Sequence, residues 1–232
     1  MFFIYSDNLK HGKMMLGVML LIALQSLVFA INSVVGRISF GENFPTEFFP
    51  ILFSLKPFVY SYTLITASFL HANFLHLLGN LMFFLALART LEKLLGTKFF
   101  ITCYIFIGAL AFIGSWIVNP NSTTPIVGSS GAVSFLMGVY LILFPNAKLR
   151  LLIIIPPFFK RFWVPSYVFL LFWIGLQLYD ILTDTQEQSG VAYATHILGF
   201  LIGVIAGMYW KEAAEDTEQR LNELYEENYE HK

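Results

Sequence analysis

Six long apolar stretches dominate this sequence of 232 residues and restrict the folds that are open to it. A helix needs about 20 predominantly apolar residues to cross a bilayer. Stretches close to that length fall at 14–35, 73–90, 99–118, 128–144, 165–182 and 192–210. Composition agrees, because 57% of the residues are hydrophobic and only 12% are charged, whereas soluble domains carry about 25% charged residues. We therefore predict an all-α membrane protein with six transmembrane helices.

Two further apolar stretches could be mistaken for spans. The stretch 48–70 is long enough, but Pro50, Lys56 and Pro57 interrupt it, and proline removes a backbone donor and kinks helices. The stretch 151–159 is too short and ends in a double proline followed by two phenylalanines. We interpret both stretches as interfacial segments.

The positions of the basic residues test this count. Lys and Arg near span ends accumulate on the cytoplasmic side. With six spans and a cytoplasmic N-terminus, only Arg37 and Lys56 of the fourteen basic residues fall outside, and a seventh span at 48–70 would reverse this for most of the others. We predict a short cytoplasmic N-terminus at 1–13, a membrane domain at 14–210 with a first loop at about 37–72, and an acidic cytoplasmic tail at 211–232. We expect the first stretch to be retained as a span, although it resembles a secretory signal.

The remaining composition excludes several classes of function. Cys103 is the single cysteine, so an internal disulfide and a cysteine-based metal cluster are excluded. The chain has no basic stretch suited to nucleic acid. We expect no cofactor and no metal.

Three polar clusters lie within or beside the predicted spans, where polar groups are costly and mark functional sites. By the predicted topology all three lie in the outer half of the membrane, so we expect them to line one cavity. His76 and Asn80 are four residues apart and share one helical face. The clusters comprise His71, His76 and Asn80; Ser129, Ser130 and Ser134; and His196.

Small residues predict which helices meet. Gly199, Gly203 and Gly207 repeat every fourth residue on the sixth span, and Ser130, Ser134 and Gly138 do so on the fourth. Small residues at this spacing allow close approach of helices in lipid. Packing of the two rows would bring His196, one turn before Gly199, toward Ser130.

That pairing would have chemical meaning. A serine hydroxyl becomes a good nucleophile when a base takes its proton, and histidine is the usual base. No carboxylate lies at the depth of His196 in the predicted topology, so we expect a Ser–His dyad rather than a triad. Unpaired backbone N–H groups at the start of a helix, with His76 and Asn80, could stabilise an oxyanion.

Other readings of the same residues stay open. Each serine or histidine alone could be a helix-start residue or a packing contact. The histidines could bind a metal, but no HExxH spacing and no nearby carboxylate support this. Polar groups at mid-depth also mark transport paths, although the chain shows no internal repeat.

Taken together, these motifs resemble the rhomboid family of intramembrane serine proteases. The resemblance extends from the first span to the sixth and implies a rhomboid-like six-helix bundle with a partly membrane-embedded first loop. It rests on Gly128-Ser129-Ser130-Gly131, on His71 with His76 and Asn80, and on His196 with Gly199 and Gly203. It implies that Ser130 is the nucleophile and His196 the base, and that His76, Asn80 and the Ser130 N–H form the oxyanion hole.

The resemblance also implies supporting roles and a substrate class. His71 would be structural at the outer mouth of the cavity, and Glu92 structural at the cytoplasmic end of the second span. The fifth helix would gate lateral entry of substrates, which would be single-pass transmembrane proteins within the bilayer. An inactive rhomboid-fold binding protein is the alternative. We expect the membrane to be a bacterial inner membrane, and the sequence does not predict an oligomeric state.

Two positions depart from the family pattern. The Trp-Arg pair that the family often carries in its first loop corresponds here to Tyr62-Thr63. Ser134 occupies the place of a tyrosine on which the catalytic histidine often packs. We therefore expect His196 to be less firmly held than in the family.

Overall fold

Each predicted span coincides with a helix in the computed structural model, which describes residues 2–9, 15–40, 63–118, 120, 126–155, 158–183 and 192–230. The helices are α1 (Leu16–Phe40), α4 (Phe74–Leu95), α5 (Thr97–Val118), α6 (Ser130–Leu143), α7 (Ser166–Leu182) and α9 (Tyr193–Glu230). Within the described residues, four segments are long and apolar enough to cross a membrane: α1, α4, α5 and Tyr193–Lys211 of α9. The apolar helices α6 and α7 are shorter, with 14 and 17 residues, so a count of six spans stays a prediction.

The first loop is described only in part. Residues 41–62, including Tyr62 and most of the stretch 48–70, lie outside the described residues. The described remainder forms one short helical turn, α3 (Thr63–Thr66), and a 3-10 turn, η2 (Ala67–Phe69). Ala67, Ser68 and Phe69 are buried, so this end of the loop packs into the protein.

The expectation of an all-α chain is wrong in one respect, because the chain contains a three-stranded antiparallel sheet. Its strands are β1 (Phe2–Asp7), β2 (Lys148–Ile155) and β3 (Phe158–Pro165), in the order β1-β2-β3. The predicted interfacial segment 151–159 is therefore the end of a β-hairpin, with β1 paired to β2. A run rich in Leu and Ile that is interrupted by a double proline fits two strands better than one interfacial segment.

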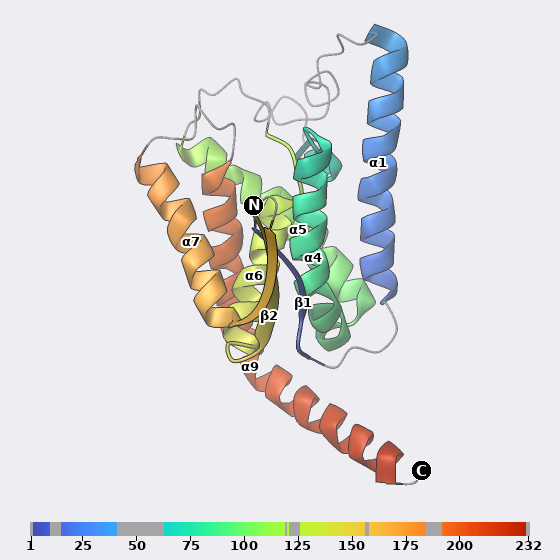
Figure 1. The fold of residues 1–232 in the computed structure, drawn as a ribbon, viewed down its shortest axis with the longest axis vertical. Coiled ribbons are helices and arrows are strands. Elements are labelled where there is room, and N and C mark those ends of the chain that lie inside the picture. The colour runs from blue at the N-terminus through green and yellow to red at the C-terminus, as the bar shows by residue number, and fades with distance from the viewer. Residues whose placement is uncertain are drawn as a thin grey trace.

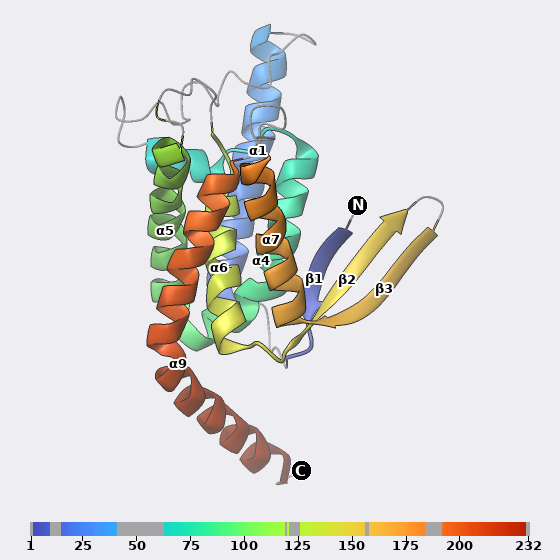
Figure 2. The same cartoon turned by 90° about the vertical axis from the view of Figure 1, so that its left-hand side faces the viewer.

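The helix α6 occupies the centre of the bundle (Figures 1 and 2), and its residues Gly131 to Tyr140 are all buried. Its closest neighbour is α9, and the two backbones touch through glycines. A Cβ at Gly203 would collide with the carbonyl oxygen of Phe135, and one at Gly138 with that of Phe200. The predicted packing of the two small-residue rows is confirmed.

Buried carboxylates hold together the end of the bundle at which α4 ends, which we call the Glu92 end. Glu92 is fully buried, and its two oxygens accept hydrogen bonds from the backbone N–H groups of Gly17 and Val18, each at 2.7 Å. It therefore satisfies two of the unpaired donors at the start of α1. At the same end Asp7 of β1 accepts hydrogen bonds from Thr90 of α4 and Tyr140 of α6, both at 2.7 Å.

The last helix does not stop at the predicted boundary between the membrane domain and the tail. The helix α9 continues through Lys211 to Glu230, and this part extends away from the bundle beyond the Glu92 end (Figure 1). The acidic tail is therefore helical.

Candidate active site

The segment before α6 is held in a conformation that suits glycine alone. Gly128 has a φ of +117°, a region that residues with a side chain rarely adopt. Its N–H donates to the carbonyl oxygen of Ala67 at 2.9 Å. A Cβ at Gly128 would lie 2.9 Å from two ring atoms of His76 and 3.6 Å from Nδ2 of Asn80. The backbone before the two serines therefore lies directly against two of the predicted oxyanion-hole residues.

The two adjacent serines lie in different environments. Ser129 is only 1% exposed, and its Oγ is 3.5 Å from Nε2 of His71, a distance beyond the usual range for a strong hydrogen bond. Ser130 begins α6 and is only partly buried. Of the two serines, Ser130 is the more exposed residue.

The first turns of α4 carry His76 and Asn80, two of the predicted oxyanion-hole residues. Asn73 caps it by accepting a hydrogen bond from the His76 N–H at 2.9 Å. One turn later the Nδ2 of Asn80 donates to the carbonyl oxygen of His76 at 3.2 Å. An amide nitrogen carries two hydrogens, so Asn80 retains a second donor.

His71 precedes α4 and supports the same cluster. It is 1% exposed, and its ring meets the ring of His76 edge to face, with the centroids 5.3 Å apart. Burial, with a smaller contribution from neighbouring His76, lowers the pKa of His71 to about 3. The imidazole of His71 is therefore neutral at physiological pH.

His196 lies in the first turn of α9, and its closest polar contact comes from α7. Its Nδ1 is 2.6 Å from Oε1 of Gln177, a buried side chain. An amide oxygen only accepts hydrogen bonds, so Nδ1 carries the proton and Nε2 is left as an acceptor. Gln177 is not among the predicted site residues, because only carboxylates were weighed as the third group that could orient the histidine base. Its signal was available, because it is a strongly polar residue within an apolar stretch.

Aromatic rings support His196 although residue 134 is a serine. The ring of Trp173 on α7 lies 5.7 Å from that of His196, and the ring of Tyr193 lies 6.4 Å away. Ser134 instead donates its hydroxyl to the carbonyl oxygen of Ser130 at 2.6 Å. The contacts from α7 thus surround His196 without an aromatic residue at position 134, and the expectation that His196 is less firmly held than in the family stays a prediction.

The start of α6 packs against the part of α9 that carries His196. A Cβ at Gly131 would lie 3.0 Å from Cγ2 of Thr195, and one at Gly199 would collide with the carbonyl oxygen of Gly131. Thr195 and Gly199 flank His196 in the sequence, and Gly131 follows Ser130. The two helices thus meet where the predicted nucleophile and base stand. A direct contact between Ser130 and His196 stays a prediction.

Comparisons with known proteins give the family. The Rhomboid domain matches residues 60–212. The Bacillus subtilis (strain 168) protein named "Putative rhomboid protease YdcA" is 42% identical over 85 residues, 36% of this chain and 42% of its own length. The Arabidopsis thaliana "RHOMBOID-like protein 12, mitochondrial" is 28% identical over 162 residues, 62% of this chain and 45% of that protein. The Saccharomyces cerevisiae "Rhomboid protein 1, mitochondrial" is 26% identical over 162 residues, 68% of this chain and 44% of that protein.

The matches cover less than half of the length of each of these relatives. The family match, in contrast, covers most of this chain and includes every residue of the candidate site. With its long apolar helices, the chain is an integral membrane protein, and it belongs to the rhomboid family.

Proposed function

We propose that this chain is an intramembrane serine endopeptidase in which Ser130 is the nucleophile and His196 the general base. One observation carries the proposal: the short segment Gly128 to Gly131 lies between the His76 ring on one side and α9 around His196 on the other. A peptide carbonyl bound at Ser130 would then lie close to a base, His196, and to two side-chain donors, His76 and Asn80. Membership of the rhomboid family supports the same assignment.

The reaction would proceed by acyl transfer. Nε2 of His196 takes the proton of Ser130 as Oγ attacks the carbonyl carbon of the substrate, and Gln177 holds Nδ1 so that Nε2 faces the hydroxyl. His76, the free donor of Asn80 and the Ser130 N–H stabilise the negative oxygen. The protonated His196 then donates to the leaving amine. Water, activated by the same base, hydrolyses the acyl-enzyme.

The substrates we propose are single-pass membrane proteins, cleaved near the membrane boundary at which α6 begins. The bundle would cross the membrane six times, with both termini in the cytoplasm. We place the chain in a bacterial inner membrane, in keeping with its Bacillus relative, whereas relatives from Arabidopsis and yeast are named as mitochondrial. Fractionation of the source cells tests that location.

The matched pair of serines provides the test of the nucleophile. Purified protein is incubated in detergent with a transmembrane substrate, and cleavage is compared for the wild type, Ser130→Ala and Ser129→Ala. We expect Ser130→Ala to lower the rate by about a thousandfold or more, and Ser129→Ala to retain most of it. Cleavage that survives Ser130→Ala would contradict the assignment.

Two alternatives give different results in the same preparation. An inactive rhomboid-fold binding protein would cleave none of a varied set of transmembrane substrates but would still retain some of them. A transporter, the less favoured alternative, would produce solute flux in liposomes that Ser130→Ala leaves unchanged.

A further inference from the structure

The three-stranded sheet has a face of unusual composition, formed by side chains that point away from the helices. Arg150 pairs with Trp163, and Leu152 pairs with Arg161, and directly opposed residues of antiparallel strands share a face. The guanidinium carbon of Arg150 lies 5.4 Å from the centre of the Trp163 ring, and that of Arg161 lies 5.9 Å from the Phe159 ring. We call these four residues, Arg150, Phe159, Arg161 and Trp163, the arginine–aromatic face.

This face and the hairpin tip expose large apolar surfaces. Phe158 is 76% exposed, Phe159 68% and Trp163 45%. Soluble proteins rarely expose contiguous apolar patches of this kind unless a membrane or a partner covers them. The opposite face is covered by the protein itself, since Leu149 and Leu151 are buried in the core.

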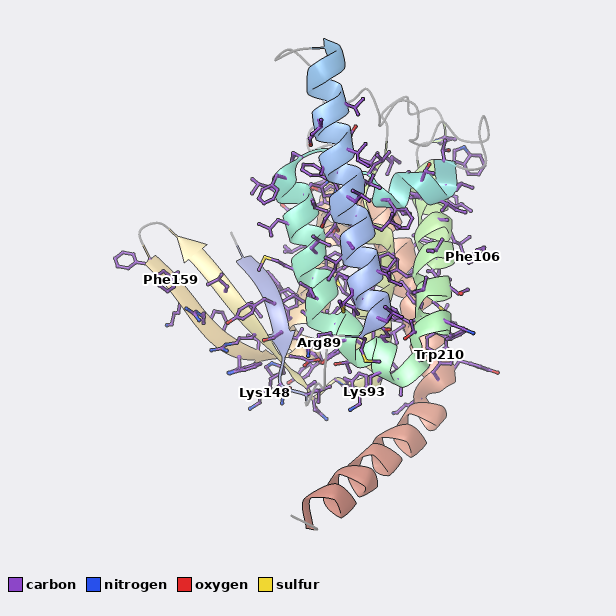
Figure 3. The ribbon with its side chains drawn as sticks, turned by 90° about the vertical axis from the view of Figure 1, so that its right-hand side faces the viewer. Arg89, Lys93, Phe106, Lys148, Phe159 and Trp210 are labelled. Carbon is purple, nitrogen blue, oxygen red and sulfur yellow. The ribbon has the colours of Figure 1, made fainter. Side chains whose placement is uncertain are left out.

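The position of the sheet indicates what covers the face. The sheet starts at the Glu92 end, close to Lys148, and leans outward from the bundle, so that its far end reaches the level of the middle of the helices (Figures 2 and 3). Phe159 projects from the tip, away from the helices (Figure 3). The neighbouring helix α4 is one of the candidate spans. A face at this height beside a candidate span would lie next to lipid rather than in the aqueous phase beyond the bundle.

The chemistry of the face fits the headgroup layer. Aromatic rings gather at the membrane–water interface, and basic side chains there bind anionic lipids. A guanidinium group can donate two parallel hydrogen bonds to a phosphate group. Among the described residues, the guanidinium groups of Arg150 and Arg161 contact aromatic rings rather than carboxylates, so their N–H groups are available to phosphate.

We propose that the arginine–aromatic face binds the phosphate groups of anionic phospholipids in the adjoining leaflet, with Phe158 and Phe159 inserted among the acyl chains. The sheet thus anchors the Glu92 end of the bundle in the membrane surface. This assignment does not depend on proteolysis, because none of its residues contributes to the candidate active site.

Insertion of the tip is tested by a nitroxide label. Because Cys103 is the single cysteine, Cys103→Ser followed by Phe159→Cys places one label at the tip. Reference labels replace exposed Phe106 on α5, which faces outward (Figure 3), and exposed Asn146 in the turn after α6. In phosphatidylcholine–phosphatidylglycerol vesicles we expect the label at 159 to relax faster with oxygen than with a water-soluble nickel chelate, as at 106. A response like that at 146 would overturn the insertion.

Headgroup binding is tested by the lipid that the protein retains. Protein is extracted from vesicles of equal phosphatidylcholine and phosphatidylglycerol, and the retained lipid is measured by mass spectrometry. We expect wild type to be enriched in phosphatidylglycerol and the variant R150Q/R161Q to lose roughly fivefold in affinity for it per guanidinium removed. The control K98Q/K211Q removes the same charge from exposed lysines outside the sheet and should lose less. Equal losses would overturn the assignment to the arginine–aromatic face.

Two further results discriminate between occupants. Release of the lipid by millimolar glycerol phosphate would indicate a site for free phosphate instead of a membrane surface. Dipolar broadening between labels at 159 would show that a second copy of the chain covers the tip, and it too would overturn the proposal. Circular dichroism of every variant, with a melting temperature near that of wild type, shows that the fold is retained.

Discussion

The two ends of the helix bundle both bury polar side chains, but they use them differently. At the Glu92 end the buried acids are fully engaged: Glu92 accepts two backbone N–H groups and the hydroxyl of Thr97, at 2.6 to 2.7 Å. At the opposite end, where α6 and α9 begin and which we call the Ser130 end, several contacts are equally short, but some polar groups beside the candidate site are less fully engaged. Ser129 and His71 are 3.5 Å apart, and Asn80 donates only to its own helix in the contacts described above.

The difference separates a structural polar cluster from one suited to chemistry. A buried charge is tolerated when every acceptor position is occupied, and it then fixes the elements that surround it. Neutral donors with spare capacity hold the fold less firmly, but they are free to turn toward a charge that develops on a bound substrate. Changes at the Glu92 end should therefore affect stability first, and changes at the Ser130 end should affect rate first.

The largest effect should follow loss of the Glu92 carboxylate. Glu92→Ala leaves the N–H groups of Gly17 and Val18 without their acceptor in a buried place, and we expect a cost of about 3–5 kcal/mol. Denaturation in detergent, followed by circular dichroism, measures it. Glu92→Gln keeps one acceptor oxygen and should cost less. A loss of unfolding free energy below about 1 kcal/mol in Glu92→Ala would show that Glu92 does not hold this end of the bundle together.

The next largest effect should come from separating α6 and α9. In Gly199→Ala the new methyl group meets the carbonyl oxygen of Gly131, so the helices must move apart at a cost of about 1–3 kcal/mol. Because His196 lies one turn away, the cleavage rate should fall with stability.

Gly79→Ala is the matched control for this change. A Cβ at Gly79 meets nothing within 4 Å, so we expect a gain of up to about 1 kcal/mol from the better helix former. Equal melting temperatures of the two alanine variants would show that close packing of α6 and α9 is dispensable.

A smaller effect, confined to rate, is expected at Gln177. Gln177→Leu removes the acceptor for Nδ1 of His196, which frees the ring to adopt the wrong tautomer, and we expect kcat to fall by about 10-fold to 100-fold with little change in KM. The exposed neighbour Leu178 on the same helix is the control, as Leu178→Ala. The pH profile of kcat separates the two roles: it should shift in Gln177→Leu if Gln177 acts through His196, and stay fixed if Gln177 only packs.

The smallest effect should appear as a pH dependence of stability. The pKa of His71 is about 3 in the folded protein, against about 6.5 when it is unfolded. As pH falls below 6.5 the unfolded chain takes up a proton that the folded protein refuses, so His71 lowers stability progressively until about pH 3. At pH 5 the loss is up to about 2 kcal/mol.

Melting temperatures of wild type and His71→Gln at pH 7.5 and pH 5 measure this effect. Between the two pH values the wild type should lose more stability than the variant, which has no group to protonate at that position. Parallel losses would show that His71 is solvated and can be protonated in the folded protein.

Much of the helical framework could be predicted because hydrocarbon imposes a strict length and composition on spans. The packing of α6 on α9 could be predicted equally well, because glycines spaced four residues apart give a helix one face that another backbone can approach closely. The sheet could not be predicted, because the pairing of Phe2–Asp7 with Lys148–Ile155 is a long-range contact that no local sequence pattern indicates. Its short strands are also apolar enough to resemble an interfacial segment.

At the site, sequence spacing placed His76 and Asn80 on one face, and the structure brings both to Gly128. The sequence marks Gln177 as a polar residue in an apolar stretch, but it could not foresee the contact with His196, since that contact depends on how α7 rotates and leans against α9. The same rotation brings Trp173 onto the histidine ring. The rotation of a helix is set by its packing against neighbours. The sequence of a span that is apolar on nearly every side does not indicate which side faces which neighbour.

The pairing of β1 with β2 also has a consequence for the order of assembly. Phe2 and its partner Ile153 are separated by most of the bundle in the sequence, so the first strand to be synthesised has no partner until α6 has been made. Closing a loop of that length costs conformational entropy and slows the step. Asp7 then contacts Thr90 and Tyr140 together, which joins the earliest part of the chain to its middle. Docking of the first strand should be a late event that locks α4 and α6 after both helices are in the membrane.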